Sequence, residues 1–213
     1  YRDIEDIIST FEKFSYNTKK GLIVCGDNEN IRKIKFDKEV IFYGFNEDND
    51  VVATNVNFSE DGASFDCIMN GELFDHFDLP LYGSHMVLNA LACTAVCHMY
   101  GLSKDTIKNG LFAFTGAHRR FEYIGNFNNS ISVFDDYAHH PTEIIATANA
   151  LKEKKYNQSW VIFQPHTYSR TKNLLPDFVK ALKLFDNIII TDIYAAREKN
   201  TYNIHSKDLV EAL

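Results

Sequence analysis

Apolar residues in the first third of the chain recur first with the period of a helix and then with the shorter period of strands. Isoleucine and phenylalanine are spaced for one helical face over residues 3–14. Asp61-Gly62 is a hairpin signal between two apolar runs. Such runs predict strands at 21–25, 40–45, 51–58 and 63–69, with a helical turn at 31–34. We therefore expect α/β structure followed by antiparallel strands.

The middle of the chain changes to the period of longer helices. An apolar face predicts a helix over 84–100, and Gly101 is suited to end it because glycine tolerates the left-handed backbone of a C-cap. A second helix is expected over 103–112. The residues 116–122 are polar and cationic, so we place a domain boundary there, with domains at 1–117 and 118–213.

After this boundary, short apolar strands alternate with helical segments. Ile131, Val133 and Phe134 predict a buried strand, since β-branched and aromatic residues favour strands. Further elements are expected as strands at 159–163 and 187–191 and helices at 141–155, 172–185 and from about 206. This alternation is typical of a parallel sheet with flanking helices. The fold class is therefore α/β, with a mixed sheet first and a Rossmann-like, mainly parallel sheet second.

Composition narrows the class of protein. The 213 residues carry a net charge of −7 and no long basic block, which argues against nonspecific binding to nucleic acid. Apolar runs are interrupted well before the length of a membrane span. The four cysteines do not suggest a disulfide framework, and Cys93 and Cys97 are expected to be core residues of a helix rather than a metal or redox pair. This cysteine usage favours a cytoplasmic protein.

Polar side chains follow each expected strand of the second domain. The three segments are 135–140, 164–171 and 191–198. Because the carboxyl ends of parallel strands meet at one edge of a sheet, we expect a carboxylate, imidazoles and two arginines to converge there. Arginine offers a planar fork that binds a carboxylate or a phosphate through two hydrogen bonds. The edge is therefore a candidate anion-binding site.

These polar residues also have simpler interpretations. Asp135 can cap the helix that is expected to begin at Pro141, and His166 can fill the sheet edge. His139 and His140 suggest a metal site, although residues adjacent in sequence rarely both reach one ion.

Two arginines of the connector, Arg119 and Arg120, have two interpretations. They can form ion pairs between domains, or they can clamp a phosphate. No Gly-x-x-x-x-Gly-Lys-Ser/Thr loop occurs in the chain, so the loop that would cradle a nucleotide triphosphate is absent from it.

Five short blocks carry a resemblance to a known family. They are Gly83-Ser84-His85 with Asn89, Arg119-Arg120-Phe121-Glu122, Asp135-Asp136-Tyr137-Ala138-His139-His140-Pro141-Thr142-Glu143, Phe163-Gln164-Pro165-His166-Thr167-Tyr168-Ser169-Arg170-Thr171 and Asp192-Ile193-Tyr194-Ala195-Ala196-Arg197-Glu198. In this order, over residues 83–198, the blocks resemble the Mur ligases. Residues 1–82 lack comparably sharp motifs, but their order is similar to the later half of that family's central domain.

The resemblance implies an architecture of incomplete domains. Residues 1–117 would be the later part of a central ATP-binding domain, and 118–213 much of a C-terminal amino-acid-binding domain. The UDP-sugar domain, the phosphate loop and the main magnesium ligands would precede Tyr1, and the last strands would follow Leu213. We therefore expect the isolated chain to be inactive.

Within the family, the chain most resembles the alanine-adding branch. The implied substrates are UDP-N-acetylmuramate, L-alanine and ATP, with Mg²⁺ as a cofactor. ATP would phosphorylate the lactyl carboxylate, and the amine of L-alanine would then attack this acyl phosphate. Such a reaction belongs to peptidoglycan precursor synthesis in the bacterial cytoplasm.

For the nucleotide, the resemblance assigns three residues. Asn89 matches a residue that contacts adenine, Arg120 matches a linker arginine that reaches the ATP phosphates, and Asp136 matches an aspartate that binds the ribose hydroxyls. The chain departs from the family at Met86, where an asparagine is usual, and this removes one polar contact on the adenine side.

For the amino acid, the resemblance assigns Tyr137, His139 and Arg170, and Arg170 is expected to bind the carboxylate of alanine. Arg120 and His139 are the expected catalytic residues. Thr167 stands where many relatives carry a second arginine, so carboxylate binding would fall more heavily on Arg170.

Three other functions are considered. A sister enzyme, the murein-tripeptide recycling ligase, has a similar Asp-Asp-x-Ala-His-His-Pro block, although residues 164–166 and 169–171 favour the alanine-adding branch. A noncatalytic binding module would need no phosphate loop. A metal-dependent hydrolase would use Asp135, Asp136, His139 and His140 as its metal ligands.

Overall fold

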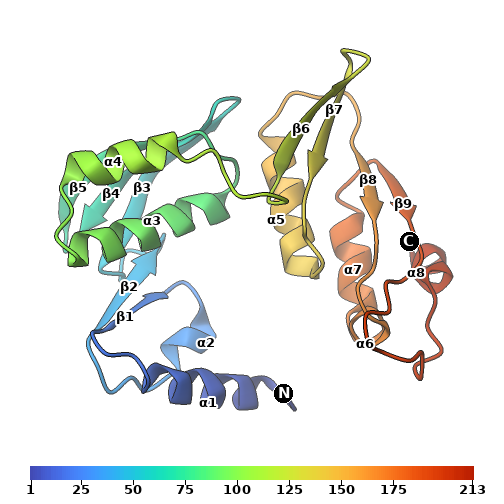
Figure 1. Ribbon diagram of the computed structural model, residues 1–213, viewed down its shortest axis with the longest axis horizontal. Helices are drawn as coiled ribbons and strands as arrows, with labels where there is room; N and C mark the ends of the chain where they lie inside the picture. Colours follow the sequence, from blue (N-terminus) through green and yellow to red (C-terminus); the bar gives the residue numbers. More distant parts are fainter. The chain divides into compact units, whose positions relative to one another are not determined.

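The computed structural model describes residues 1–213 and divides into two compact units, Tyr1–Thr115 and Gly116–Leu213 (Figure 1). Each unit contains both helices and strands, so the prediction of a mixed α/β fold is confirmed. None of the helices combines the length and the apolar character that a membrane crossing requires.

The first unit is built on one five-stranded sheet. Its elements in chain order are α1 (Ile4–Ser15), β1 (Leu22–Cys25), α2 (Glu29–Arg32), β2 (Val40–Gly44), β3 (Val51–Ser59), β4 (Gly62–Met69), β5 (Glu72–Leu79), α3 (Ser84–Met99) and α4 (Lys104–Ala113). The strand order is β1-β2-β3-β4-β5, with parallel pairing from β1 to β3 and antiparallel pairing from β3 to β5. The expected change from α/β to antiparallel structure is therefore present.

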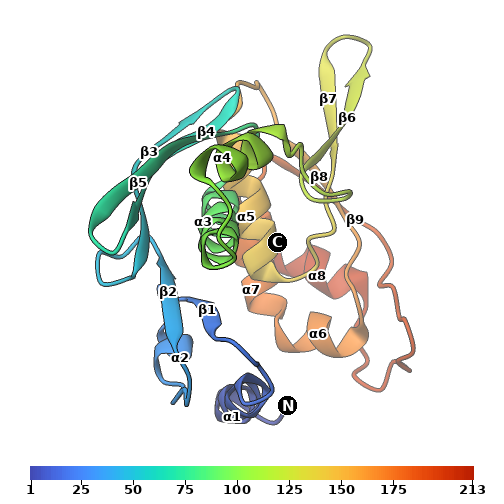
Figure 2. The same cartoon turned by 60° about the vertical axis from the view of Figure 1, so that its left-hand side comes forward.

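Helix α3 contacts β1 to β4, and α4 contacts β5, so both helices pack on the sheet (Figures 1 and 2). The core between them contains Phe65, Phe77 and Leu91, which are fully buried. Strand β5 was not predicted from the sequence. Its apolar residues Phe74 and Phe77 are three positions apart, which breaks the strict alternation expected of a strand, and a register shift in the β4–β5 pairing accommodates this spacing.

The second unit contains two separate two-stranded sheets. Its elements are β6 (Glu122–Phe127), β7 (Ile131–Asp135), α5 (Pro141–Lys152), β8 (Trp160–Phe163), α6 (Tyr168–Asn173), α7 (Leu175–Leu182), β9 (Asn187–Ile190) and α8 (Ser206–Ala212). Strands β8 and β9 pair in parallel, as the alternating pattern predicts. The core joins Ile144 of α5, Phe163 of β8, Phe178 of α7 and Leu209 of α8.

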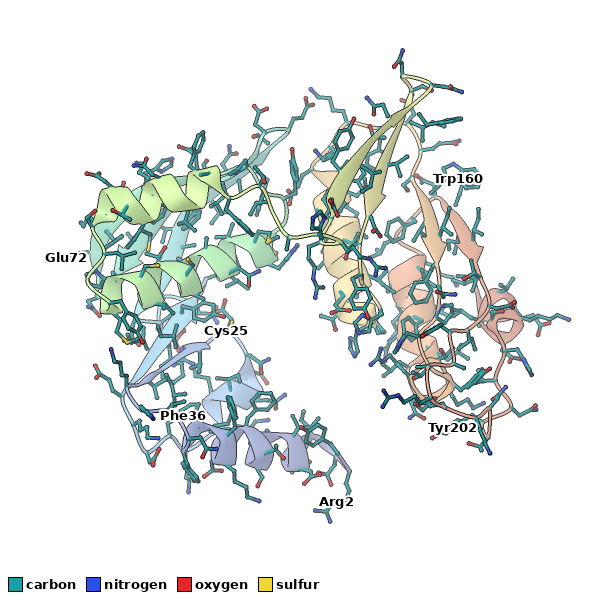
Figure 3. All side chains as sticks on the ribbon, viewed as in Figure 1. Arg2, Cys25, Phe36, Glu72, Trp160 and Tyr202 are labelled. Atoms are coloured by element: carbon teal, nitrogen blue, oxygen red, sulfur yellow. The ribbon has the colours of Figure 1, made fainter.

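The strand predicted at 131–134 is present as β7, but the expectations that it is buried and lies in a parallel sheet were wrong. Strand β7 instead pairs antiparallel with β6, an element that was not predicted, and the two form a ribbon. Ile131 is 54% exposed and Val133 is 43% exposed. Their β-branched side chains specify an extended backbone, but that preference does not determine which face is buried. Apolar exposure continues on β8, where Trp160 is 61% exposed (Figure 3).

The helix predicted at 172–185 is two helices. Thr167 caps α6, which begins four residues earlier than expected, and the chain breaks at Leu174 before α7. Pro176 lies in the first turn of α7, where its missing N–H is tolerated, and it disfavours continuation of the preceding helix.

We expect the core position on β5 to dominate the stability of the first unit. Phe77→Ala should lower its free energy of unfolding by about 3–5 kcal/mol, because Phe77 is fully buried against Phe65 and Phe74. Leu73→Ala on the same strand, at a side chain that is 62% exposed, should cost less than about 0.5 kcal/mol. Urea unfolding followed by circular dichroism measures both, and equal losses would contradict this packing.

Candidate functional site

The segment between β7 and α5 is fixed by the carboxylate of Glu143. One of its oxygens accepts hydrogen bonds from the backbone N–H groups of His139 (2.9 Å) and His140 (3.0 Å). The ring Nδ1 of His140 in turn accepts a hydrogen bond from the N–H of Thr142 (3.3 Å). Together with Pro141 at the start of α5, these bonds satisfy groups that a helix leaves unpaired at its N-terminus. Residues 139 and 140 therefore have defined positions.

Burial tends to raise the pKa of the Glu143 carboxyl, but neighbouring donors and positive charges outweigh it and hold the pKa below its ordinary value. These are, in order, the backbone N–H of His139, the charge of the His139 ring, the N–H of His140 and the charge of Arg120. Glu143 therefore remains a carboxylate at neutral pH.

Four aromatic rings from three segments form a continuous series. The ring of Tyr137 lies 5.0 Å from that of His139, His139 lies 5.7 Å from His166, and His166 lies 5.6 Å from Tyr194, measured between centroids. These rings come from the loops after β7, β8 and β9. The three segments therefore meet, and Arg170 joins them through His166. Arg197 contacts none of these rings, and β7 does not belong to the β8–β9 sheet.

The two histidines of this series present different nitrogen atoms. Nδ1 of His139 lies 2.7 Å from the carbonyl oxygen of Tyr137, so it donates a proton there and leaves Nε2 as an acceptor when the ring is neutral. In His166, Nδ1 lies 3.3 Å from a guanidinium nitrogen of Arg170, so Nδ1 accepts. The hydrogen bonds therefore assign opposite tautomers to the neighbouring rings.

Arg170 and His166 are electrostatically linked. Burial lowers the pKa of His166, and the charges of Arg170 and His139 lower it further, while Glu198 opposes them. His166 is therefore neutral at physiological pH, which lets it accept from Arg170 without charge repulsion.

The residue that caps α6, the short helix that carries Arg170, has a strained backbone. Thr167 has φ 63° and ψ 149°, a region that a β-branched residue rarely adopts. Its N–H donates to the carbonyl of Tyr194 (2.9 Å), and its carbonyl accepts from Oγ1 of Thr171 (2.7 Å). Contacts on both sides thus maintain the strained residue.

Glu198 connects the third segment to the same loop. Its carboxylate accepts hydrogen bonds from both the N–H (2.9 Å) and the hydroxyl of Ser169. These bonds hold the pKa of Glu198 below its ordinary value, and the bond from the Ser169 hydroxyl has the larger effect. The carboxylate is therefore committed to Ser169 and tethers residues 194–198 to residues 167–170.

Asp136 is oriented within the second unit. One carboxylate oxygen accepts a hydrogen bond from the N–H of Ala138 (2.9 Å), and the other accepts from Oγ1 of Thr147 (2.7 Å). A carboxylate offers about four acceptor positions, so two remain for a ligand hydroxyl pair.

The two arginines of the connector lie beside the same loop. Arg119 is 3.4 Å from a carboxylate oxygen of Asp135 and lies over the ring of Tyr137. Arg120 is 3.8 Å from a carboxylate oxygen of Glu143. Exposed ion pairs of this kind contribute less than about 1 kcal/mol, so either guanidinium can exchange its partner for an anionic ligand.

Asn89, which the resemblance assigns to adenine, lies on α3 in the first unit. Asn89 is exposed on α3, and its amide nitrogen lies 3.6 Å from the sulfur of Met86. Met86 therefore takes up one amide donor of Asn89.

The structure thus brings Tyr137, His139 and Arg170 together. Arg120 joins them through Glu143, and Asp136 anchors the preceding loop on α5 through Thr147. Sequence reasoning did not assign roles to three residues that contact these directly, namely Glu143, Thr147 and His166. It also assigned none to Tyr194, which contacts His166, or to Glu198, which is bonded to Ser169. Spacing offered a signal for Thr147, because residues four apart share a helix face and Glu143 is four positions before it.

No group of three or more histidine, cysteine, aspartate or glutamate side chains is arranged to hold a metal ion. The residues that a metal-dependent hydrolase would need are engaged otherwise: Asp135 with Arg119, and Asp136 with Ala138 and Thr147.

Comparison with known proteins agrees with this fold. Residues 1–97 match the Mur ligase middle domain, and residues 119–213 match the Mur ligase glutamate ligase domain. The chain belongs to the Mur ligase family, which confirms the resemblance seen in the sequence.

Within this family, the chain is similar to ligases that add alanine. The chain is 43% identical, over 219 aligned residues, to the UDP-N-acetylmuramate–L-alanine ligase of Acetivibrio thermocellus; the match covers 100% of the chain and 46% of that relative. The chain therefore spans about half of this relative's length.

Among solved structures, the UDP-N-acetylmuramate–alanine ligase MurC of Thermotoga maritima matches with a TM-score of 0.77 and 28% identity, over 99% of this chain and 44% of that one. The murein peptide ligase of Psychrobacter arcticus matches with a TM-score of 0.64 and 25% identity, over 89% of this chain and 41% of that one.

The link between Arg170 and His166 can be tested by titration. Arg170→Gln should raise the pKa of His166 toward its ordinary value of 6.5, because it removes one of the charges that lower it. The ring signals of His166, followed by NMR as a function of pH, give this pKa. Lys172→Gln, at an exposed residue of the same helix, should leave it unchanged.

The same shift has a consequence for stability. Since folding lowers the pKa of His166, the unfolded chain binds the proton more readily than the folded chain does. The resulting stability is complete above the unfolded-state pKa of about 6.5 and is lost as pH falls from there through the lower folded-state pKa. An unchanged His166 titration in Arg170→Gln would contradict the contact.

Proposed function

We propose that this chain forms part of an ATP-dependent ligase that joins L-alanine to the lactyl carboxylate of UDP-N-acetylmuramate, in peptidoglycan precursor synthesis in the bacterial cytoplasm. One observation carries the proposal: Arg170, His166, His139 and Tyr137 form a continuous set on the loops that carry the Mur ligase blocks. The identity of 43% to a ligase of this name over the whole chain supports the choice of substrate.

The reaction has two steps with different demands. The lactyl carboxylate attacks the γ-phosphorus of ATP, which forms an acyl phosphate and releases ADP. The amine of alanine then attacks the acyl carbon, loses a proton, and expels inorganic phosphate from the tetrahedral intermediate. The first step requires neutralisation of negative charge on the phosphoryl group, and the second requires an oriented amine and the exclusion of water.

Arg170 and His139 suit the second step. The guanidinium of Arg170 can bind the carboxylate of alanine, since only one of its nitrogens contacts His166. His139 directs Nδ1 to the carbonyl of Tyr137, so Nε2 is free to accept a hydrogen bond from the amine and to receive its proton. In this proposal Tyr137 forms the neighbouring wall of the amino-acid site.

Arg120, Asp136 and Asn89 are proposed to bind ATP. Arg120 is held only by a weak pair with Glu143, so it can turn to the phosphates. Asp136 retains acceptor positions for the ribose hydroxyls, and Thr147 keeps its carboxylate oriented. Asn89 is exposed on α3, and one N–H of its amide group remains available for adenine.

Mg²⁺ would accompany ATP in such a reaction and neutralise phosphate charge. No group of three or more histidine, cysteine, aspartate or glutamate side chains is arranged around an ion position in this chain, and Mg²⁺ takes most of its ligands from phosphate and water. We therefore propose that its ligands come from the nucleotide and from parts of the protein outside these residues.

The direct test uses the full-length protein that carries this chain. Phosphate release should require UDP-N-acetylmuramate and L-alanine together, and glycine or serine should replace alanine less well. Release with a murein tripeptide in place of alanine would instead identify the recycling ligase. Alanine-dependent release by residues 1–213 alone would contradict the proposed need for a phosphate loop from elsewhere in the protein.

Arg170 should act on alanine rather than on ATP. Arg170→Gln is expected to raise the KM for alanine about ten- to a hundredfold, the usual effect of losing a charged hydrogen bond, while the KM for ATP changes less than about twofold. Lys172→Gln is the matched control. Equal increases in the two KM values would remove Arg170 from the amino-acid site.

A further inference from the structure

The segment after β9 carries an arginine that takes no part in the contacts described above. Arg197 is exposed and forms no ion pair and no side-chain hydrogen bond. By contrast, Arg119 and Arg120 lie beside carboxylates, and Arg170 lies beside His166. Arg197 is thus an uncompensated positive charge in the second unit.

The position of Arg197 is defined although its side chain is unpaired. The carbonyl of Ala195 accepts a hydrogen bond from the N–H of Glu198 (3.0 Å), which closes a tight turn around Ala196 and Arg197. Ala196 has φ 51°, so the chain reverses direction immediately before the arginine. Arg197 therefore lies at the tip of a turn rather than on a loose loop.

Both ends of this turn are hydrogen-bonded to residues 165–169, which lie directly before Arg170 in the chain. Before the turn, the N–H of Tyr194 donates to the carbonyl of Pro165 (2.8 Å), and Tyr194 also accepts from Thr167. After it, the carboxylate of Glu198 is bonded to Ser169. Consecutive Cα atoms are about 3.8 Å apart, so Arg197 begins one residue from the contact with Ser169.

A carboxylate ligand at this edge has more acceptor capacity than Arg170 can meet. Its two oxygens offer about four positions, whereas the planar fork of one guanidinium meets two of them, and one nitrogen of Arg170 also contacts His166. Thr167, on the same loop, carries no charge. Arg197 is the remaining arginine on the three segments that meet here, and its guanidinium matches a carboxylate in shape.

We propose that Arg197 is a second binding residue for the carboxylate of the incoming amino acid, opposite Arg170. This inference rests on the proposed function. It assigns one arginine to each of two tethered segments, Arg170 on α6 and Arg197 in the turn after β9, so that their spacing depends on the bonds between Glu198 and Ser169. The engagement of Glu198 with Ser169 also keeps that carboxylate from neutralising Arg197.

The test compares variants of the full-length protein by their KM values. Arg197→Gln should raise the KM for L-alanine about ten- to a hundredfold and leave the KM values for ATP and UDP-N-acetylmuramate within about twofold. Arg197→Lys should give an intermediate KM, because lysine keeps the charge but lacks the fork. Lys199→Gln, at an exposed cation two residues away, should have little effect.

Several outcomes would overturn the inference. They are a KM for alanine that matches Lys199→Gln, an Arg197→Lys enzyme no better than Arg197→Gln, and an increase confined to ATP, which would assign Arg197 to phosphate instead. The wild-type protein separates this inference from the proposed function. If it shows no alanine-dependent phosphate release, the proposed function fails; if it is active and Arg197→Gln is unaffected, only the role of Arg197 fails.

Discussion

The parallel pairing of β8 and β9 continues beyond the ends of the strands, and the candidate site depends on that continuation. The N–H of Thr191 donates to the carbonyl of Phe163 at the last strand position (3.0 Å). His166 and Tyr194 then form an isolated parallel bridge, and Thr167 bonds back to Tyr194. Two loops that would otherwise separate are thus held side by side.

This pairing accounts for the unusual features around it. Thr167 can occupy a strained backbone region because bonds to Tyr194 and Thr171 hold it from both sides. The strained backbone places Arg170 beside His166. Burial and the positive charge of Arg170 lower the pKa of His166 and keep its imidazole neutral. The loop after β7 joins the cluster through ring contacts alone, from His139 to His166. The site therefore has a rigid side, on the β8–β9 sheet, and a side held by the start of α5.

Much of this could be predicted from the sequence, since the polar blocks after β8 and β9 directly follow apolar strands whose parallel pairing the alternating pattern indicates. The convergence of His166 and Arg170 with residues 194–198 follows from that topology. The exposure of β7 could not be predicted, because Ile131 and Val133 favour an extended backbone whether or not the strand is buried. The break at Leu174 and the cap at Thr167 depend on backbone angles that composition does not specify. The contact of Asp136 with Thr147 required the helix phase to be known.

The central claim is that the carboxylate of the amino acid binds between the loops after β8 and β9. A crystal structure of the full-length protein with its proposed product, UDP-N-acetylmuramoyl-L-alanine, tests this most directly, because the product retains that carboxylate. We expect an alanyl carboxylate oxygen within about 3.2 Å of a guanidinium nitrogen of Arg170. A product whose alanyl carboxylate contacts Arg119 or Arg120 instead, with Arg170 still on His166 alone, would contradict the account.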